Sequence, residues 1–232
     1  MNTFVNKILT DFARLINGRS WFLLLPLVSV SCTGLTSNRK TLDLKAFEIS
    51  VPKEWNYKKE QGIDSFVGEI EGPKCSFSFD YSGMGYASNL LPTEKEFLEE
   101  RRWMRECYFC KSGITYSGHI PDDDAKRTIH APTKSQKDKF PKADYIADLT
   151  LKDSTIYIPI ELTAEIKNHN IQVDSNSQYV FKTIWPKVPG RGMTGIYIHS
   201  RKTTFNFQIN GENLSLENQQ QALAAFKTIH FK

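Results

Sequence analysis

The chain has 232 residues, of which 40% are hydrophobic, so it is long and apolar enough to form one domain with a substantial core. Its 30 basic and 26 acidic residues give a formal net charge of +4. Three of the basic residues and one of the acidic residues lie within residues 1–31, so the remainder of the chain carries +2. This near-neutral balance argues against a dedicated nucleic-acid binder, which needs a concentrated basic face.

Residues 1–31 have the pattern of a secretory signal peptide. Lys7, Arg14 and Arg19 form a positive leader, and an uncharged apolar stretch follows from Trp21 to Ser31. This apolar stretch is too short for a membrane span, which needs roughly 20 residues. We therefore expect residues 1–31 to be removed from the mature protein.

The sequence Val28-Ser29-Val30-Ser31-Cys32 resembles a bacterial lipobox. This resemblance implies that Cys32 becomes the mature N-terminus and carries acyl chains such as palmitate, which would hold the protein to membrane lipid in the cell envelope. Residues 32–43 are expected to form a lipidated N-terminus and polar tether. No acidic residues follow Cys32 closely, which favours a periplasm-facing domain. A secreted protein without a lipid anchor, in which Cys32 is incidental, stays open as an alternative.

Alternating side chains predict a sheet-rich domain over residues 44–232. Phe47, Ile49 and Val51 share one face of an expected strand, and Phe77 and Phe79 share one face of another. A hairpin is expected over 145–162, and Pro159 indicates that its second strand lies at an edge or carries a bulge. The remaining elements predicted by the pattern are strands at 65–71, 178–185, 194–200 and 203–209, a helix capped by Thr93 that extends to about Tyr108, a final helix capped by Ser215, and a solvated polar insertion at about 121–142.

These elements predict an α+β fold. The strands lie mostly in antiparallel neighbour pairs, and each of the two amphipathic helices has one apolar stripe. We expect a single sandwich domain with both helices packed on one face of the sheet.

Two short segments carry a family resemblance. Residues 47–55 look like the opening strand of PsbP-like proteins, and residues 226–231 are similar to the end of their C-terminal helix. Bacterial members of that group include small envelope lipoproteins, in agreement with Cys32. Because the group shares no catalytic residues, the resemblance implies a binding or assembly role.

Three cysteines lie beyond Cys32. Cys75 belongs to an expected strand, while Cys107 and Cys110 have the CxxC spacing at the end of the expected helix. A local disulfide, two inert thiols and a redox-active pair all fit this spacing. No second pair of ligands at zinc-site spacing accompanies the two cysteines, so we expect no metal there.

A candidate anion-binding rim combines Lys187, Arg191 and Arg201 near the glycine-rich segment Gly190–Gly195. This segment is spelled GxGxxG, but a β-rich segment follows it in place of a helix, which indicates a strand connection and not a dinucleotide site. Surface strand connections also account for the three basic residues.

No catalytic constellation is present in the sequence, and we expect neither a cofactor nor an enzyme. We expect a membrane-anchored lipoprotein that acts as a non-catalytic binding or assembly module, with an envelope protein or a small ligand as its partner. Two alternatives stay open: an envelope thiol/disulfide-active protein that uses Cys107 and Cys110, and a secreted ligand-binding protein without an anchor.

Overall fold

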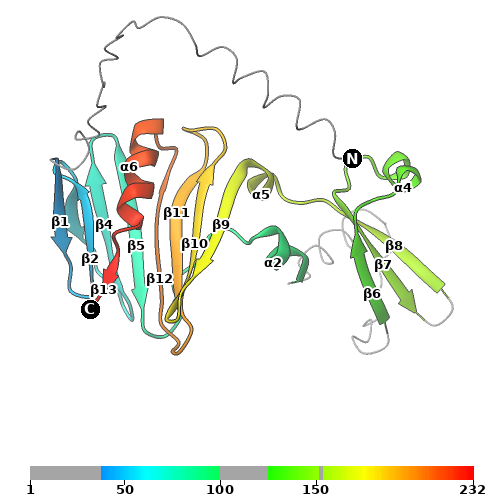
Figure 1. Cartoon of the computed structure of the whole chain (residues 1–232), viewed down its shortest axis with the longest axis horizontal. Coiled ribbons are helices and arrows are strands. Elements are labelled where there is room, and N and C mark those ends of the chain that lie inside the picture. The colour runs from blue at the N-terminus through cyan, green and yellow to red at the C-terminus, as the bar shows by residue number, and fades with distance from the viewer. Residues whose placement is uncertain (1–37, 100–124, 152–153) are drawn as a thin grey trace, which may run out of the picture. The chain divides into compact units, whose positions relative to one another are not determined.

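The computed structural model describes residues 38–99, 125–151 and 154–232, and it has an α+β fold built mainly from antiparallel sheets (Figure 1). The largest sheet has seven strands, and every hydrogen-bonded neighbour pair in it is antiparallel. From one edge to the other, its strands are β3 (Asn56–Lys59), β4 (Phe66–Gly72), β5 (Cys75–Ser82), β12 (Asn206–Glu212), β11 (Met193–Ser200), β10 (Tyr179–Pro186) and β9 (His169–Ser175).

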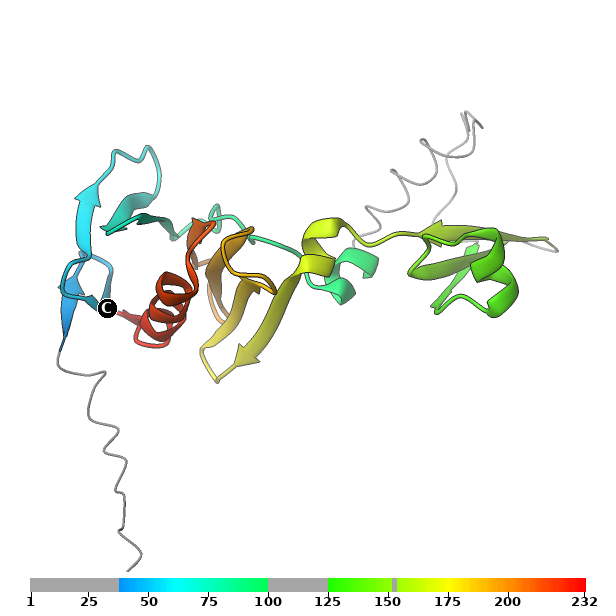
Figure 2. The same ribbon diagram turned by 90° about the horizontal axis from the view of Figure 1, so that it is seen from above.

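One face of the seven-stranded sheet, which we call the α6 face, is apolar. Strict alternation brings Phe77 and Phe79 of β5 to this face, where they meet Phe207 and Ile209 of β12. Helix α6 (Leu216–Phe226) and the small sheet of β1 (Arg39–Asp43), β2 (Phe47–Pro52) and β13 (His230–Phe231) pack against it. Seen from above in Figure 2, α6 (red) lies to one side of the sheet. This layer buries the main hydrophobic core.

The final helix begins as the sequence predicts. The hydroxyl of Ser215 accepts a hydrogen bond from the backbone N–H of Asn218 at 3.2 Å, which satisfies one of the unpaired donors of the first turn. Helix α6 ends at Phe226, and His230–Phe231 then adds a short strand to β2. The expected helical end at residues 226–231 is therefore wrong beyond Phe226.

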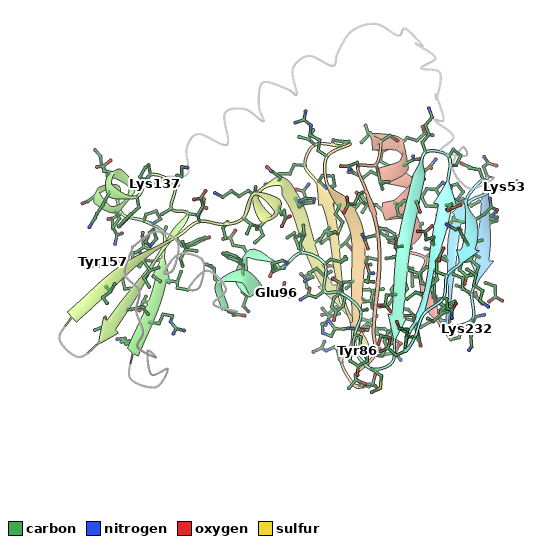
Figure 3. All side chains as sticks on the ribbon, turned by 180° about the vertical axis from the view of Figure 1, so that it is seen from behind. Lys53, Tyr86, Glu96, Lys137, Tyr157 and Lys232 are labelled. Carbon is green, nitrogen blue, oxygen red and sulfur yellow. The ribbon has the colours of Figure 1, made fainter. Side chains whose placement is uncertain are left out.

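The opposite face of the seven-stranded sheet is polar. Asp80, Gln208, Tyr197 and Lys182 are direct cross-strand neighbours on β5, β12, β11 and β10. The chain after β5 crosses this face, because the side chain of Asn206 pairs with both backbone groups of Ala87. Figure 3 shows the sheet from this side.

This crossing segment leads to helix α2 (Glu94–Glu99). The predicted capping box is confirmed: the Glu96 N–H donates to the Thr93 hydroxyl at 3.1 Å, and the Thr93 N–H donates to the Glu96 carboxylate at 2.6 Å. Glu96, labelled in Figure 3, also accepts a hydrogen bond from Lys182 on the polar face of the sheet. Helices α2 and α6 therefore contact opposite faces, which corrects the expectation that both pack on one face.

A separate three-stranded sheet is formed by β6 (Ala125–His130), β7 (Tyr145–Leu151) and β8 (Ser154–Ile160). The expected 145–162 hairpin is confirmed, and β8, which contains Pro159, lies at an edge of this sheet. Helix α5 (Ala164–Asn168) follows β8 and leads into β9. A second hydrophobic cluster joins these elements to α2, and it contains Phe97, Ala147, Leu149, Ile158, Ile160, Leu162 and Ile166.

Two expectations about irregular segments need correction. Residues 39–43, which are expected to belong to the tether, form β1 and pair with β2. Within 121–142, residues 125–130 form β6 and residues 134–139 form helix α4 (Lys134–Lys139), which has its own Thr133–Gln136 capping box. The polar sequence does not predict these two elements. Strand β6 is stabilised by pairing with β7, and helix α4 has no buried residue that would give an apolar pattern.

Candidate functional site

A groove of about 530 Å³ lies on the α6 face between helix α6 and the strands β9 and β10. We call it the α6 groove. Pockets that bind small molecules or side chains typically measure about 300–1,000 Å³, so this volume is in the functional range. Its lining residues are Gln172, Asp174, Phe181, Thr183, Trp185, Ile196, Leu223, Phe226, Lys227 and Ile229.

The floor of the α6 groove is apolar. Ile196 and Phe226 are fully buried, while Phe181, Trp185 and Leu223 are half-buried and therefore keep part of their surface accessible. Aromatic side chains that remain partly accessible in a groove offer large contact areas at a low cost in side-chain entropy. The floor is suited to apolar side chains of a ligand.

The rim of the groove is polar and carries both signs of charge. Gln172 and Asp174 extend from β9, and the Gln172 amide donates a hydrogen bond of 2.7 Å to the Asp174 carboxylate. Lys227 follows the last residue of α6, and Thr183 lies on β10. An apolar floor within a polar rim is the usual anatomy of a specific binding site.

Local sequence explains why these side chains share the groove. Alternation along β10 places Phe181, Thr183 and Trp185 on the α6 face, while Lys182 and Ile184 lie on the other face. Leu223 and Phe226 are three residues apart and lie on one side of α6. Helix α6 contacts β2 and β11, so it leaves the outer strands β9 and β10 uncovered at the groove.

Strand β9 is the last strand of the seven-stranded sheet on this side. Among the described residues, β9 is paired with β10 alone. Residues 172–175 are exposed, and the strand contains neither proline nor lysine, which are two common means of blocking an edge. The α6 groove therefore lies beside an open sheet edge.

The structure separates the residues of the predicted anion-binding rim. Lys187 and Arg191 lie between β10 and β11, whereas Arg201 follows the far end of β11. The eight residues of β11 span about 26 Å at a typical rise of 3.3 Å per residue. In addition, Arg201 donates to the backbone carbonyl of Asn176 at 3.2 Å. These three residues do not form one rim.

The glycine-rich segment Gly190–Gly195 connects two strands, as its sequence context predicts. Strand β11 begins at Met193, so no helix follows the glycines. Gly190 and Gly192 have φ values of 79° and 110°, which residues with a Cβ atom rarely adopt. The ring of His169 lies against Gly192, so the segment has a structural role at this position.

The predicted cysteine sites lie outside the described residues, which exclude Cys32, Cys107 and Cys110. The thiol/disulfide alternative therefore stays a prediction. Cys75 is described, is free and is partly exposed. Its pKa is raised by burial, which disfavours the reactive thiolate.

His130 pairs with two protein groups. The Nε2 atom of His130 lies 3.1 Å from the Asp148 carboxylate, and its Nδ1 atom lies 2.8 Å from the carbonyl of Ala131. The Ala131 carbonyl and Asp148 together raise the pKa of His130. Within the described segments, no group of three or more histidine, cysteine or acidic side chains is placed to hold a metal ion.

The sequence did not single out the α6 groove. The alternation of Phe181, Thr183 and Trp185 is a sequence signal for one shared face of the strand. Which of the two faces α6 would cover, and which strand would form the edge, could not be read from that alternation.

No protein-family model matches this chain, and no curated protein matches it either. In the part of the chain that the structure describes, no helix is both long and apolar enough to cross a bilayer. The geometry defines an α+β protein with an apolar groove beside an open strand edge.

Proposed function

We propose that this protein is a binding or assembly module of the bacterial cell envelope, held to a membrane by lipid on Cys32. Its α+β sandwich takes up an extended segment of a partner protein along β9, and the α6 groove receives the apolar side chains of that segment. The observation that carries the binding role is the position of the α6 groove directly beside the open edge of β9.

An extended segment suits this site because a sheet edge and a groove supply complementary interactions. The outward backbone groups of an edge strand provide hydrogen bonds to any sequence, and an adjacent apolar pocket provides selectivity for particular side chains. Gln172 and Asp174 belong to β9 and also line the groove, so a strand added to β9 lies next to the groove rim. A lysine or arginine in the segment has Asp174 as a partner.

The membrane anchor rests on the lipobox pattern that ends at Cys32. Because β1 begins at Arg39, the tether from the anchor to the domain consists of residues 32–38 and is shorter than the tether of residues 32–43 that the sequence predicts. Seven residues reach at most about 24 Å when fully extended, so a lipid on Cys32 keeps the start of β1 within about that distance of the membrane surface. Partners at that surface are therefore favoured.

Site-specific photo-crosslinking tests the binding site. A benzophenone side chain at Asp174 is expected to crosslink a partner in intact cells, while the same group at the fully exposed Ile63 is not. Trp185→Ala removes part of the groove floor and should reduce the Asp174 crosslink strongly, with far-ultraviolet circular dichroism confirming that the variant is folded. An unchanged crosslink in folded Trp185→Ala protein would contradict the proposal.

Metabolic labelling with a fatty-acid analogue tests the anchor separately. The wild-type protein should carry label and fractionate with membranes, whereas Cys32→Ala should do neither. Cys75→Ala is the matched control, since its thiol lies in β5 and should leave labelling unchanged. Label retained by Cys32→Ala would exclude the lipid anchor and favour a secreted protein.

A further inference from the structure

The seven-stranded sheet has two ends, and the tether enters the domain at one of them. The Lys53 N–H donates to the Asn38 carbonyl at 3.1 Å, and the Lys40 ammonium donates to the Asn56 side chain at 2.8 Å. The start of β1 therefore lies beside the turn between β2 and β3. We call this end of the sheet the tether end. Figure 3 shows Lys53 at the tether end and Tyr86 at the opposite end.

Further contacts bring α6 and the β10–β11 connection to the tether end. The Asn218 side chain of α6 donates to the Pro73 carbonyl in the β4–β5 turn at 3.3 Å. The Gly190 N–H donates to the Leu214 carbonyl at 2.8 Å, which joins the β10–β11 connection to the residues before α6. The tether end thus consists of four neighbouring segments, which are residues 53–55, 73–74, 187–192 and 213–217.

Two large apolar side chains are exposed at the tether end. Val188 in the β10–β11 connection is 59% exposed, and Leu216 at the start of α6 is 54% exposed. The exposed charged side chains around them carry both signs and nearly balance: Lys53, Lys74, Lys187, Arg191, Glu54, Glu212 and Glu217. Apolar side chains among charges of both signs suit the headgroup layer of a zwitterionic bilayer, which also carries both signs.

The length of the tether decides which end of the sheet faces the bilayer. Exposed apolar side chains occur at the opposite end as well, where Ile63, Met84 and Tyr86 follow β3 and β5. The tether of seven residues spans at most about 24 Å, whereas an eight-residue strand such as β5 spans about 26 Å. With the tether end turned away, the opposite end reaches the bilayer only at the limit of the tether. The tether end reaches it at every shorter span.

We propose that the tether end is a bilayer-contacting surface, with Val188 and Leu216 in the headgroup layer. The inference rests on the lipid anchor on Cys32 that is part of the proposed function. An anchor confines the domain to a thin layer above the bilayer and so raises the effective concentration of this surface at the lipid. Two apolar side chains then suffice for contact, although they would not hold an unanchored protein.

This orientation sets the direction of partner binding. His169 at the start of β9 pairs with Pro186 beside the tether end, and Ser175 at the end of β9 pairs with Val180 toward the opposite end. Strand β9 therefore runs away from the bilayer. A partner segment that adds to β9 extends along the membrane normal, and the α6 groove receives its side chains above the headgroup layer.

Paramagnetic broadening of methyl signals tests the orientation. The mature, lipidated protein is placed in phosphatidylcholine nanodiscs in which a small fraction of the lipid carries a gadolinium chelate on its headgroup. The methyl signals of Val188 and Leu216 should be lost. Those of Ile63 and Met84 should keep their intensity, because these side chains are at least as exposed but lie about 26 Å away at the opposite end.

Substitutions test whether the apolar contact holds the domain in this orientation. Val188→Asp combined with Leu216→Asp should reduce the broadening of the Met193 methyl signal several-fold, since Met193 begins β11 beside the tether end. Both replaced side chains are exposed, and an aspartate at the start of α6 suits the helix dipole, so the variant should fold. Ile63→Asp combined with Met84→Asp is the matched control and should leave the Met193 broadening unchanged.

The outcomes separate this inference from the anchor itself. Protein whose mass spectrum shows no acyl chains would overturn the anchor. Lipidated protein in which Ile63 and Met84 are broadened as strongly as Val188 and Leu216 would overturn the orientation alone. Equal broadening of Met193 in wild type and in the Val188→Asp and Leu216→Asp double variant would overturn the contact through these two side chains.

Discussion

The ring of His169 occupies the space next to Gly192, where an added Cβ would lie only 2.6 Å from Nε2. His169 begins β9 and Gly192 directly precedes β11, so this contact joins the edge of the sheet to the β10–β11 connection. The same Nε2 atom accepts the backbone N–H of Met193. The contact fixes the first residue of the strand edge to which we assign partner binding.

Gly192→Ala should therefore be strongly destabilising. Its φ of 110° is unfavourable for a residue with a Cβ, and the new methyl group would displace the His169 ring. We expect a loss of about 3 kcal/mol in the free energy of unfolding, the sum of backbone strain and overpacking. Urea denaturation measures this loss.

Gly190→Ala is the control for that substitution. Gly190 also has a positive φ, of 79°, but an added Cβ meets no atom within 4 Å. It should cost only about 1 kcal/mol from the backbone alone. Equal losses for the two variants would show that the His169 contact does not matter.

The Lys182–Glu96 ion pair should make stability depend on acidic pH. Partial burial alone would raise the pKa of Glu96, but the Thr93 N–H and the Lys182 ammonium outweigh burial and lower it. The pKa of Glu96 in the folded state lies below its unfolded-state value, which is near 4.5. The ion pair therefore contributes its full stabilisation at pH values above 4.5, and this contribution is lost as the pH falls through the folded-state pKa.

Glu96→Gln should remove that dependence. The Glu96 side chain is 38% exposed, so we expect a loss of at most about 1 kcal/mol at neutral pH and a smaller loss at pH 3. Urea denaturation at both pH values measures the difference. A loss of equal size at pH 3 and pH 7 would contradict the assigned pKa direction.

His130 should titrate above its ordinary range, because the Ala131 carbonyl and the Asp148 carboxylate raise its pKa. The pKa of His130 in the folded state is therefore higher than its unfolded-state value, which is near 6.5. Protonated His130 contributes its full stabilisation below pH 6.5, and this contribution is lost as the pH rises through the folded-state pKa. Asp148→Asn should lower the His130 pKa, measured by proton NMR of the imidazole ring. Identical titration curves in the two proteins would exclude the Asp148 contribution.

Lys74 lies in the tight turn between β4 and β5, where Gly72 pairs with Cys75. Its φ is 60°, in the left-handed region that costs a residue with a Cβ roughly 1–2 kcal/mol. Lys74→Gly should therefore stabilise the protein by about 1 kcal/mol, after allowance for the greater entropy of the unfolded chain. Lys53→Gly, at an exposed position where no positive φ is required, should not stabilise the protein in the same assay.

Features specified by neighbouring residues could be predicted from the sequence. The alternation of Phe77 and Phe79 placed one face of β5 in the core, and both side chains are buried there. The caps at Thr93 and Ser215 were predicted because a hydroxyl and the N–H groups two or three residues later form the whole motif. Such patterns act over a few residues, so they are visible without the fold.

The candidate sites depend on contacts between distant residues. The sequence grouped Lys187 with Arg191 and Arg201, but the structure places Lys187 at a pocket with Lys95 and Lys167. Antiparallel strands send nearby residues to opposite ends of the sheet and bring distant ones together. Sequence proximity is therefore a poor guide to a shared site.

The sequence by itself determined the α+β class, the core sides of β2 and β5, and the pattern that predicts a lipid on Cys32, because periodicity, caps and the signal pattern are local. Tertiary structure decided which face α6 covers, that β9 forms an edge, and that Lys182 meets Glu96 from 86 residues away. Burial of apolar area and pairing of buried charge are properties of the whole packed chain. The α6 groove exists only at that level.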